Sequence, residues 1–240
     1  MTSTRQPTWP RQLRLPGQVA APDGPIDMHL MYVMHHAFRR DLDLFAAAVK
    51  QTPAGERRTW QLLADRWELF AEVLHEHHTV EDEGVWPAVL ATCSPADVAT
   101  LEAMEAEHEE IDPLLESCAA GFRRLAERAD EDARAALAVR VCAARESLRR
   151  HLAHEETDAI AIIQRVLTAE DWHRIEEEHA NPKDRTLGKV VRIVPWAAHR
   201  MPREALDRVF AQPGGAGFQL IWRLTRRRYA RREAAAFRFA

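Results

Sequence analysis

The sequence predicts an all-α protein built around an up-down-up-down four-helix bundle. Glycine and tyrosine are scarce, at 9 and 2 of 240 residues, whereas the helix-favouring residues alanine, leucine, arginine and glutamate are abundant. Apolar residues recur at spacings of three and four along much of the chain, which is the period of an amphipathic helix. The breakers between these periodic stretches are short, and short connections place long helices antiparallel to one another.

Four periodic segments form the expected bundle. They cover roughly residues 26–51, 56–92, 96–129 and 131–167. Ser94 followed by Pro95 is a favourable helix start, because Ser caps free backbone N–H groups and Pro suits the first helical position. Thr168 opens a Thr-Ala-Glu-Asp sequence that predicts the capped start of a fifth helix, ending near Asn181.

The chain divides into three parts. We expect a flexible leader over 1–25, the bundle over 26–167 and a basic helical extension over 168–240. The leader has scattered Arg and Pro and no apolar run, which argues against a signal peptide. No stretch is long and apolar enough for a membrane span. The three cysteines are widely spaced without a Cys-x-x-Cys pair, so a cytoplasmic protein without disulfides or a thiolate metal site is expected.

The extension contains a short apolar piece at 190–196, a helix near 203–211 and, after a Pro-Gly-Gly break, an Arg-rich final helix. Residues 183–240 hold 14 Lys and Arg against 4 Asp and Glu, a net charge of +10. The preceding residues hold 19 against 33, a net charge of −14. We therefore expect the basic tail to dock on its own acidic bundle. The alternative is an external anionic partner, a nucleic acid or a membrane surface, and no nucleic acid partner is expected.

The inward face of each bundle helix carries histidine in an otherwise apolar row. Spacing of three and four connects Met28, Met31, His35 and Phe38 in the first helix, and the other helices repeat the pattern. In two helices a Glu follows the His one turn later. We call each inward-facing row a seam. The polar residues on the four seams are His35, His77 with Glu81, His108, and His151 with Glu155.

These residues predict a metal site. Burying several imidazoles and carboxylates without partners would cost an amount comparable to the net stability of a domain, roughly 5–15 kcal/mol. Nitrogen and oxygen ligands without thiolate favour iron or manganese, and carboxylates can bridge two ions. We therefore expect a dinuclear non-haem site with two iron ions, manganese being the other possible metal.

Other polar residues are expected outside the ligand set. Five histidines fall off the seams and are interpreted as surface residues or as hydrogen-bond partners of ligands: His29, His36, His75, His78 and His154. Asp158 lies on its seam, but a turn beyond Glu155, and is interpreted as a supporting residue or as part of a solvated bundle end.

The segments that begin at His35, His77, Glu107 and His151 (HHAFRRDL, HHTVED, EHEEI and HLAHEE) resemble the four helices of the hemerythrin-like HHE cation-binding domain. The resemblance covers about residues 26–167, and the repeated His-x-x-x-Glu is its most specific part. It implies a di-iron centre that binds O2 or related small ligands, with the two carboxylates bridging the metals. Position by position, the resemblance implies six metal ligands: His35, His77, Glu81, His108, His151 and Glu155.

One position departs from the family pattern. Hemerythrins that carry O2 have a fifth His one turn before the third-helix ligand, and Met104 stands there. A thioether is a poor ligand for ferric iron, so one metal is expected to lack a protein nitrogen. A second set of candidate ligands comes from Glu72-x-x-His75 and Glu105-x-x-His108. Both segments match the Glu-x-x-His motif of ferritin-like proteins. That scheme lacks the glutamate it needs from the first helix.

Two function classes follow from this reading. The first is a protein that binds or senses O2, NO, peroxide or iron, and the second is a di-iron oxidoreductase that turns over peroxide or O2. An oxygenase needs a pocket of several hundred Å³ for an organic substrate, whereas a sensor needs only a gas-sized path. The layer beside the ligands looks apolar and closed, which favours small ligands; it consists of Met31, Leu74, Met104 and Leu148.

Overall fold

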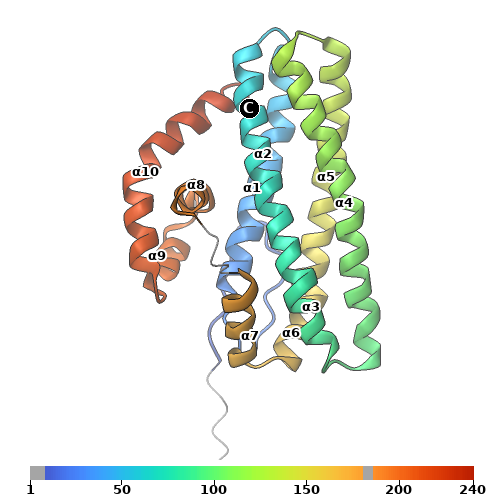
Figure 1. The fold of residues 1–240 in the computed structure, drawn as a ribbon, viewed down its shortest axis with the longest axis vertical. Coiled ribbons are helices and arrows are strands. Elements are labelled where there is room, and N and C mark those ends of the chain that lie inside the picture. The colour runs from blue at the N-terminus through green and yellow to red at the C-terminus, as the bar shows by residue number, and fades with distance from the viewer. Residues whose placement is uncertain (1–8, 181–185) are drawn as a thin grey trace, which may run out of the picture.

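The computed structural model describes residues 9–180 and 186–240, and every regular element within these ranges is a helix. Figure 1 shows four long helices lying side by side: α1 (His29–Gln51), α2 (Arg57–Val80), α4 (Pro95–Glu127) and α5 (Glu131–His154). Helix α4 packs between α2 and α5, and α5 also packs against α1. The all-α class predicted from the sequence is confirmed.

Two of the long helices contain a π-helical segment. Helix α2 continues through η1 (Glu81–Val85) into α3 (Trp86–Leu90), and α5 continues through η2 (Glu155–Ala159) into α6 (Ile160–Val166). Each π-helical segment begins at the Glu of a His-x-x-x-Glu motif. Such segments are rare and often occur at functional sites. The sequence predicted uninterrupted helices here, because an apolar periodicity does not reveal a widened turn.

The widened turns shift which residues face inward. A π-turn holds one residue more than an α-turn, so the inward row moves by one position after it. Asp158, predicted on the inner seam, has a side chain that is 55% exposed, whereas the next residue, Ala159, is fully buried. The solvated position expected for Asp158 is therefore observed, and the widened turn explains why the seam leaves it.

The helix starts follow the predicted capping chemistry. The backbone N–H of Ser94 donates to the Asp97 carboxylate at 3.1 Å, and the Ser94 hydroxyl donates to the same oxygen at 2.7 Å. In α7 (Ala169–Ile175), the Asp171 N–H donates to the Thr168 hydroxyl at 3.1 Å. Both caps give otherwise free donors a partner at the first turn.

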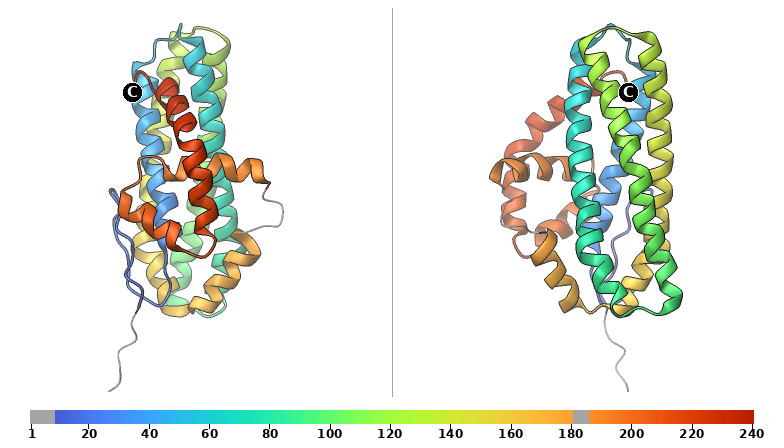
Figure 2. Two further views of the ribbon diagram at one scale, coloured as in Figure 1. Left: turned by 90° about the vertical axis from the view of Figure 1, so that its left-hand side faces the viewer. Right: turned by 45° about the vertical axis from the view of Figure 1, so that its right-hand side comes forward.

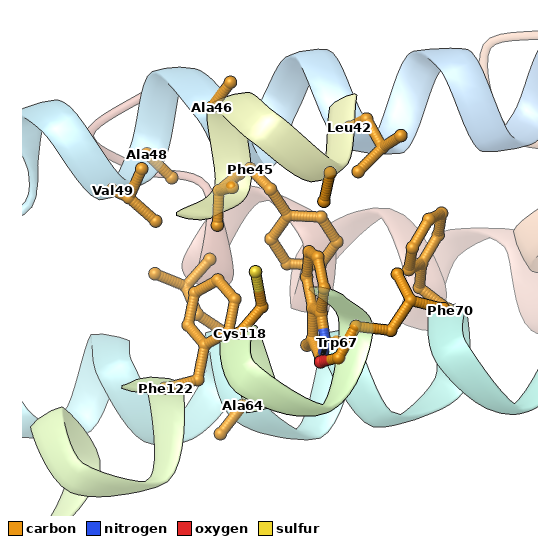
Figure 3. Close-up of a cluster of buried hydrophobic side chains, with 14 of the residues drawn as sticks. Leu42, Phe45, Ala46, Ala48, Val49, Ala64, Trp67, Phe70, Cys118 and Phe122 are labelled. Carbon is orange, nitrogen blue, oxygen red and sulfur yellow. Dashed lines mark hydrogen bonds between the residues drawn. The ribbon is translucent and has the colours of Figure 1, made fainter. Parts of the chain in front are cut away.

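An aromatic core fixes the half of the bundle near the C-terminus of α1. The rings of Phe45, Trp67 and Phe122 lie 4.9–5.5 Å apart between centroids, with Cys118 packed beside them (Figure 3). The Trp67 indole N–H donates to a backbone carbonyl at 3.2 Å. Phe237, near the end of the chain, adds a ring 5.2 Å from that of Phe45. This core lies about 15 Å along α1 from His35, since ten residues separate Phe45 from that position.

Residues 9–25, predicted as part of a flexible leader, lie against the bundle; residues 1–8 are outside the described ranges. Leu13 and Leu15 are buried, with 5% and 7% exposure. The Gln12 amide donates to the carbonyl of Ile26 at 2.7 Å and accepts from the N–H of Met28 at 3.2 Å. The leader therefore supplies a partner for a backbone N–H just before α1, a contact that its Arg and Pro content did not indicate.

The C-terminal extension covers the side of the bundle formed by α1 and α2 (Figure 2). After α7 it contains η3 (Glu176–Ala180), α8 (Leu187–Ala198), α9 (Arg203–Ala211) and α10 (Gly215–Ala236). Helix α8 contacts α1, and α10 contacts both α2 and α8. No helix in the described ranges combines the length and the apolar character needed to cross a membrane.

A buried polar network joins the extension to the bundle. Asp41 accepts from Arg66 and from the indole N–H of Trp196, each at 2.6 Å, and Arg66 donates to Glu233 at 2.6 Å. The docking of a basic extension on an acidic bundle was expected to pair bases of the extension with acids of the bundle. In the buried Arg66–Glu233 pair the base comes from the bundle and the acid from the extension. Pairs of the expected polarity, such as Arg208 with Asp27 at 2.7 Å, lie nearer the surface.

Candidate metal centre

The six side chains selected from the sequence lie together inside the bundle. His35 comes from α1, His77 from α2, His108 from α4 and His151 from α5, while Glu81 and Glu155 open the two π-helical segments. Five of them are buried to 4% exposure or less, and the His77 side chain is 9% exposed. Each long helix therefore contributes at least one polar group to a common interior point.

The polar groups form two clusters, each with its candidate ligand atoms within 4.8 Å of one another. The first contains His35, His77, Glu81 and Glu155, and the second contains His78, His108 and His151.

The two glutamates face both clusters. In the first cluster, His35 Nε2 lies 3.0 Å from Glu155 Oε2, and His77 Nε2 lies 3.1 Å from Glu81 Oε1. Toward the second cluster, His108 Nε2 lies 3.5 Å from Glu81 Oε2. His151 Nε2 lies 4.0 Å from Glu155 Oε2. Both carboxylates therefore lie between the two clusters.

Several atoms that point into this centre lack hydrogen-bond partners among the described residues, whereas the Nε2 atoms of His108 and His151 lie at hydrogen-bond distance from each other, 3.2 Å. The atoms without partners are His35 Nε2, His77 Nε2 and both carboxylate oxygens of Glu81 and Glu155. Two of the nitrogens lie near 3 Å from a carboxylate oxygen, yet the groups are not aligned as hydrogen bonds. An unpaired buried polar group costs about 1–3 kcal/mol. Buried atoms that converge without bonding one another fit cations held among them, so the residues present fit a metal centre.

The comparison with family models agrees with this geometry. The model described as the hemerythrin HHE cation binding domain matches residues 27–163. The chain belongs to the hemerythrin HHE cation-binding domain family. Comparison with curated proteins and with solved structures gave no match. The resemblance noted in the sequence is thereby confirmed over nearly the whole range in which its motifs occur.

The HHE domain of this chain contains a fifth interior histidine that the sequence analysis placed elsewhere. His78 was interpreted as a surface or supporting residue, but it is 3% exposed, and neither of its ring nitrogens has a hydrogen-bond partner. Its ring stacks on that of His108, with centroids 3.8 Å apart. Consecutive residues point about 100° apart on a helix, and α2 lies between neighbours on two sides. His77 can therefore face His35 of α1 while His78 faces α4 and α5.

Acidic residues outside the six hold three of the imidazoles. His35 Nδ1 lies 2.9 Å from Glu156, His108 Nδ1 lies 2.8 Å from Asp82, and His151 Nδ1 lies 2.9 Å from Glu107. A carboxylate at Nδ1 favours the tautomer that leaves Nε2 free to bind a metal, and it fixes the plane of the ring. The sequence analysis did not identify these acids. Asp82 and Glu156 each directly follow the Glu of a His-x-x-x-Glu motif, which is the signal that could have found them.

The pKa values of the two carboxylates in this centre shift in opposite directions. Burial and the neighbouring Glu155 raise the pKa of Glu81. Burial would also raise the pKa of Glu155, but His35 outweighs it and lowers that pKa to about 2. Burial lowers the pKa of His77 to about 3, with His35 adding to the effect. Burial likewise lowers the pKa of His78. A lowered pKa favours the neutral imidazole, which is the form that binds a metal.

The ferritin-like ligand scheme is not assembled. Glu72 lies at the surface near Lys189 and Arg192, and His75 is exposed. Glu105 is also exposed. Met104 is fully buried in the apolar core, as expected for its side chain.

Proposed function

We propose that this HHE domain is an up-down-up-down bundle that holds two iron ions and binds O2 or a related small ligand such as NO or peroxide. The observation that carries the proposal is the set of buried imidazole nitrogens and carboxylate oxygens that converge without hydrogen-bond partners. In the proposed assignment His35 and His77 hold one ion, and His78, His108 and His151 hold the other. Glu81 and Glu155 would be shared between the two ions.

This assignment revises the expectation that Met104 leaves one ion short of a nitrogen. His78 supplies a third imidazole to the second ion. His35, His77 and the two shared carboxylates would hold the first ion, which would have fewer protein ligands than the second. An open position favours binding of an exogenous ligand, so we place the reactive side at His35 and His77.

The chemistry that bound iron supplies is the binding and reduction of O2 or a similar small molecule. The protein's own part is to keep the ligand nitrogens free and the rings fixed. Glu156, Asp82 and Glu107 each accept a hydrogen bond from Nδ1 of their imidazole and orient Nε2 toward the centre. Iron is preferred to manganese on the family relationship, and the donor set suits either metal.

An oxidoreductase is the second candidate function. It is favoured by a cavity of about 280 Å³ that reaches His77 and Glu81, the side of the centre with fewer ligands. The apolar layer predicted beside the ligands is therefore not closed at Met31, which lines that cavity.

Metal analysis of matched histidine variants tests the proposal. We expect about two iron ions per wild-type chain and about one for His78→Ala, because the second ion loses one of its three imidazoles. His75→Ala is the control, since His75 is exposed on the same helix. The proposal predicts full iron content for that variant. Iron content unchanged in His78→Ala would refute the five-histidine assignment.

Spectra distinguish the two candidate functions. Anaerobically reduced, iron-loaded protein is mixed with O2, NO or peroxide, and its absorption is followed over time. A stable and reversible adduct supports ligand binding, whereas sustained consumption of O2 or peroxide supports the oxidoreductase. Protein that binds neither iron nor manganese after reconstitution refutes both.

A further inference from the structure

A mainly apolar cavity separates the extension from the bundle beside the metal centre. It has a volume of about 280 Å³ and is lined on the bundle side by residues of α1 and α2, such as Met31 and Val73. The extension supplies the opposite walls, including Trp172, Val194 and Phe210. The cavity lies between two packed parts of the chain and reaches the candidate ligands His77 and Glu81.

The cavity has a mouth and an inner end. Leu30 and Phe218 also line it and are 45% and 41% exposed, so apolar side chains open it toward solvent. At the inner end, His77 and Glu81 belong to the lining, and the atoms His77 Nε2, Glu81 Oε1 and Glu81 Oε2 have no hydrogen-bond partner. An apolar chamber with a few converging polar groups is the usual form of a small-molecule site.

We propose that this cavity binds a neutral, apolar organic molecule of about ten carbon atoms and that the C-terminal extension builds the site. The size follows from comparison, since a dry protein cavity of about 150 Å³ accommodates benzene and this one is roughly twice as large. The link to oxidation chemistry rests on the proposed function, because the occupant would lie against the iron ligands His77 and Glu81. Binding itself does not depend on iron.

The charge of the lining disfavours an anionic ligand. Besides Glu81, the acidic residues Glu76 and Glu176 line the cavity, and its lining contains no Lys or Arg among residues 9–180 and 186–240. Glu76 pairs with Lys189, which is not part of the lining. Burial raises the pKa of Glu176, so its charged form is disfavoured. An organic anion such as a fatty acid would meet carboxylates without a basic partner, and a neutral molecule avoids this repulsion.

Three probes of one shape test the proposal on the full chain. Naphthalene, 2-naphthoate and 1-naphthylmethylamine are titrated by fluorescence into metal-free and iron-loaded protein. We expect naphthalene to bind both forms and 2-naphthoate to bind at least tenfold more weakly. Tighter binding of either charged probe than of naphthalene would overturn the proposed ligand class. Failure of all three to bind would overturn the site.

A cavity-filling variant locates the binding. Val194→Phe adds a ring inside the cavity and should weaken naphthalene binding at least tenfold, whereas Val191→Phe is the control. Val191 is on the same helix, is 37% exposed and does not line the cavity. If Val194→Phe fails to fold, Val209→Phe obstructs the space from α9 instead. Unchanged naphthalene affinity in a folded obstructing variant would overturn the location.

Iron content and the spectrum of the iron centre separate this proposal from the proposed function. Val194→Phe should retain wild-type iron content, and naphthalene should perturb the absorption of the iron-loaded wild type. Naphthalene binding in protein that takes up no iron would refute the proposed function and leave the cavity site standing. Full iron content with no naphthalene binding would refute the cavity site alone.

Discussion

The buried network around Asp41 offers a quantitative test of how the extension is attached. Asp41 is fully buried and accepts hydrogen bonds from Arg66 and Trp196. Replacing it with Asn keeps the size of the side chain but removes the charge. The Arg66 side chain is only 7% exposed, so its charge loses a partner in a place where water does not replace it.

The expected cost of Asp41→Asn is about 3 kcal/mol of unfolding free energy. Removing one partner of a buried pair costs about 3–5 kcal/mol. We expect the lower end because Glu233 remains 2.6 Å from Arg66 and compensates part of its charge. For a protein of this size, 1 kcal/mol corresponds to about 2–4 °C in melting temperature, so the midpoint should fall by about 6–12 °C.

The effect should depend on pH with a definite sign. Burial alone would raise the pKa of Asp41, but Arg66 and Arg40 outweigh it and hold that pKa below its ordinary value. A carboxylate with a lowered folded pKa stabilises the protein above its unfolded pKa, about 4, and this stabilisation is lost as pH falls through the folded pKa. The difference between wild type and Asp41→Asn should be complete at pH 7 and shrink below about pH 4.

Urea unfolding followed by circular dichroism at several pH values measures this difference. Asp43→Asn is the control, since Asp43 lies on the same helix with a side chain 48% exposed and pairs with Arg149 at the surface. Such pairs contribute about 0–1 kcal/mol. Equal losses in the two variants, or a loss below 1 kcal/mol in Asp41→Asn, would refute the reasoning.

Two further substitutions test contacts near the metal centre and the leader. Glu156→Gln weakens the acceptor at His35 Nδ1, so metal affinity measured by competition with a chelator should fall about 10–100-fold; unchanged affinity would show that this contact does not orient the ring. Gly24→Ala places a Cβ 2.2 Å from the Gln164 amide oxygen and should cost about 1–3 kcal/mol in urea unfolding. Gly55→Ala meets nothing within 4 Å and serves as its control; a similar loss there would contradict the steric explanation.

The expectations that depended on helical period agree with the structure. Spacing of three and four fixes which residues of a single helix share a face, and it selected six of the seven side chains that the structure brings into the two clusters. Local signals also marked helix starts, because a capping residue acts on the backbone beside it. Thr168 caps its helix as the sequence predicts, and at Ser94 the Asp97 carboxylate accepts from the free backbone N–H.

Other features depended on the packing of neighbouring elements. His78 enters the centre because α2 faces helices on two sides, which a single apolar row does not express. Asp82 and Glu156 reach imidazoles of other helices, across 26 and 121 positions of the sequence. The burial of Leu13 and Leu15 likewise comes from contact with a surface that forms only when the bundle assembles.

The sequence by itself determined that this chain forms helices and that four of them carry candidate metal ligands on their inner faces. Both follow from interactions within one turn of a helix, which the order of residues fixes. Only the tertiary structure decided that a fifth histidine, His78, enters the centre and that carboxylates contact the imidazole Nδ1 atoms. It also formed the cavity beside His77. These depend on distances between helices that are far apart in the chain, and such distances are set by the packing of the whole molecule.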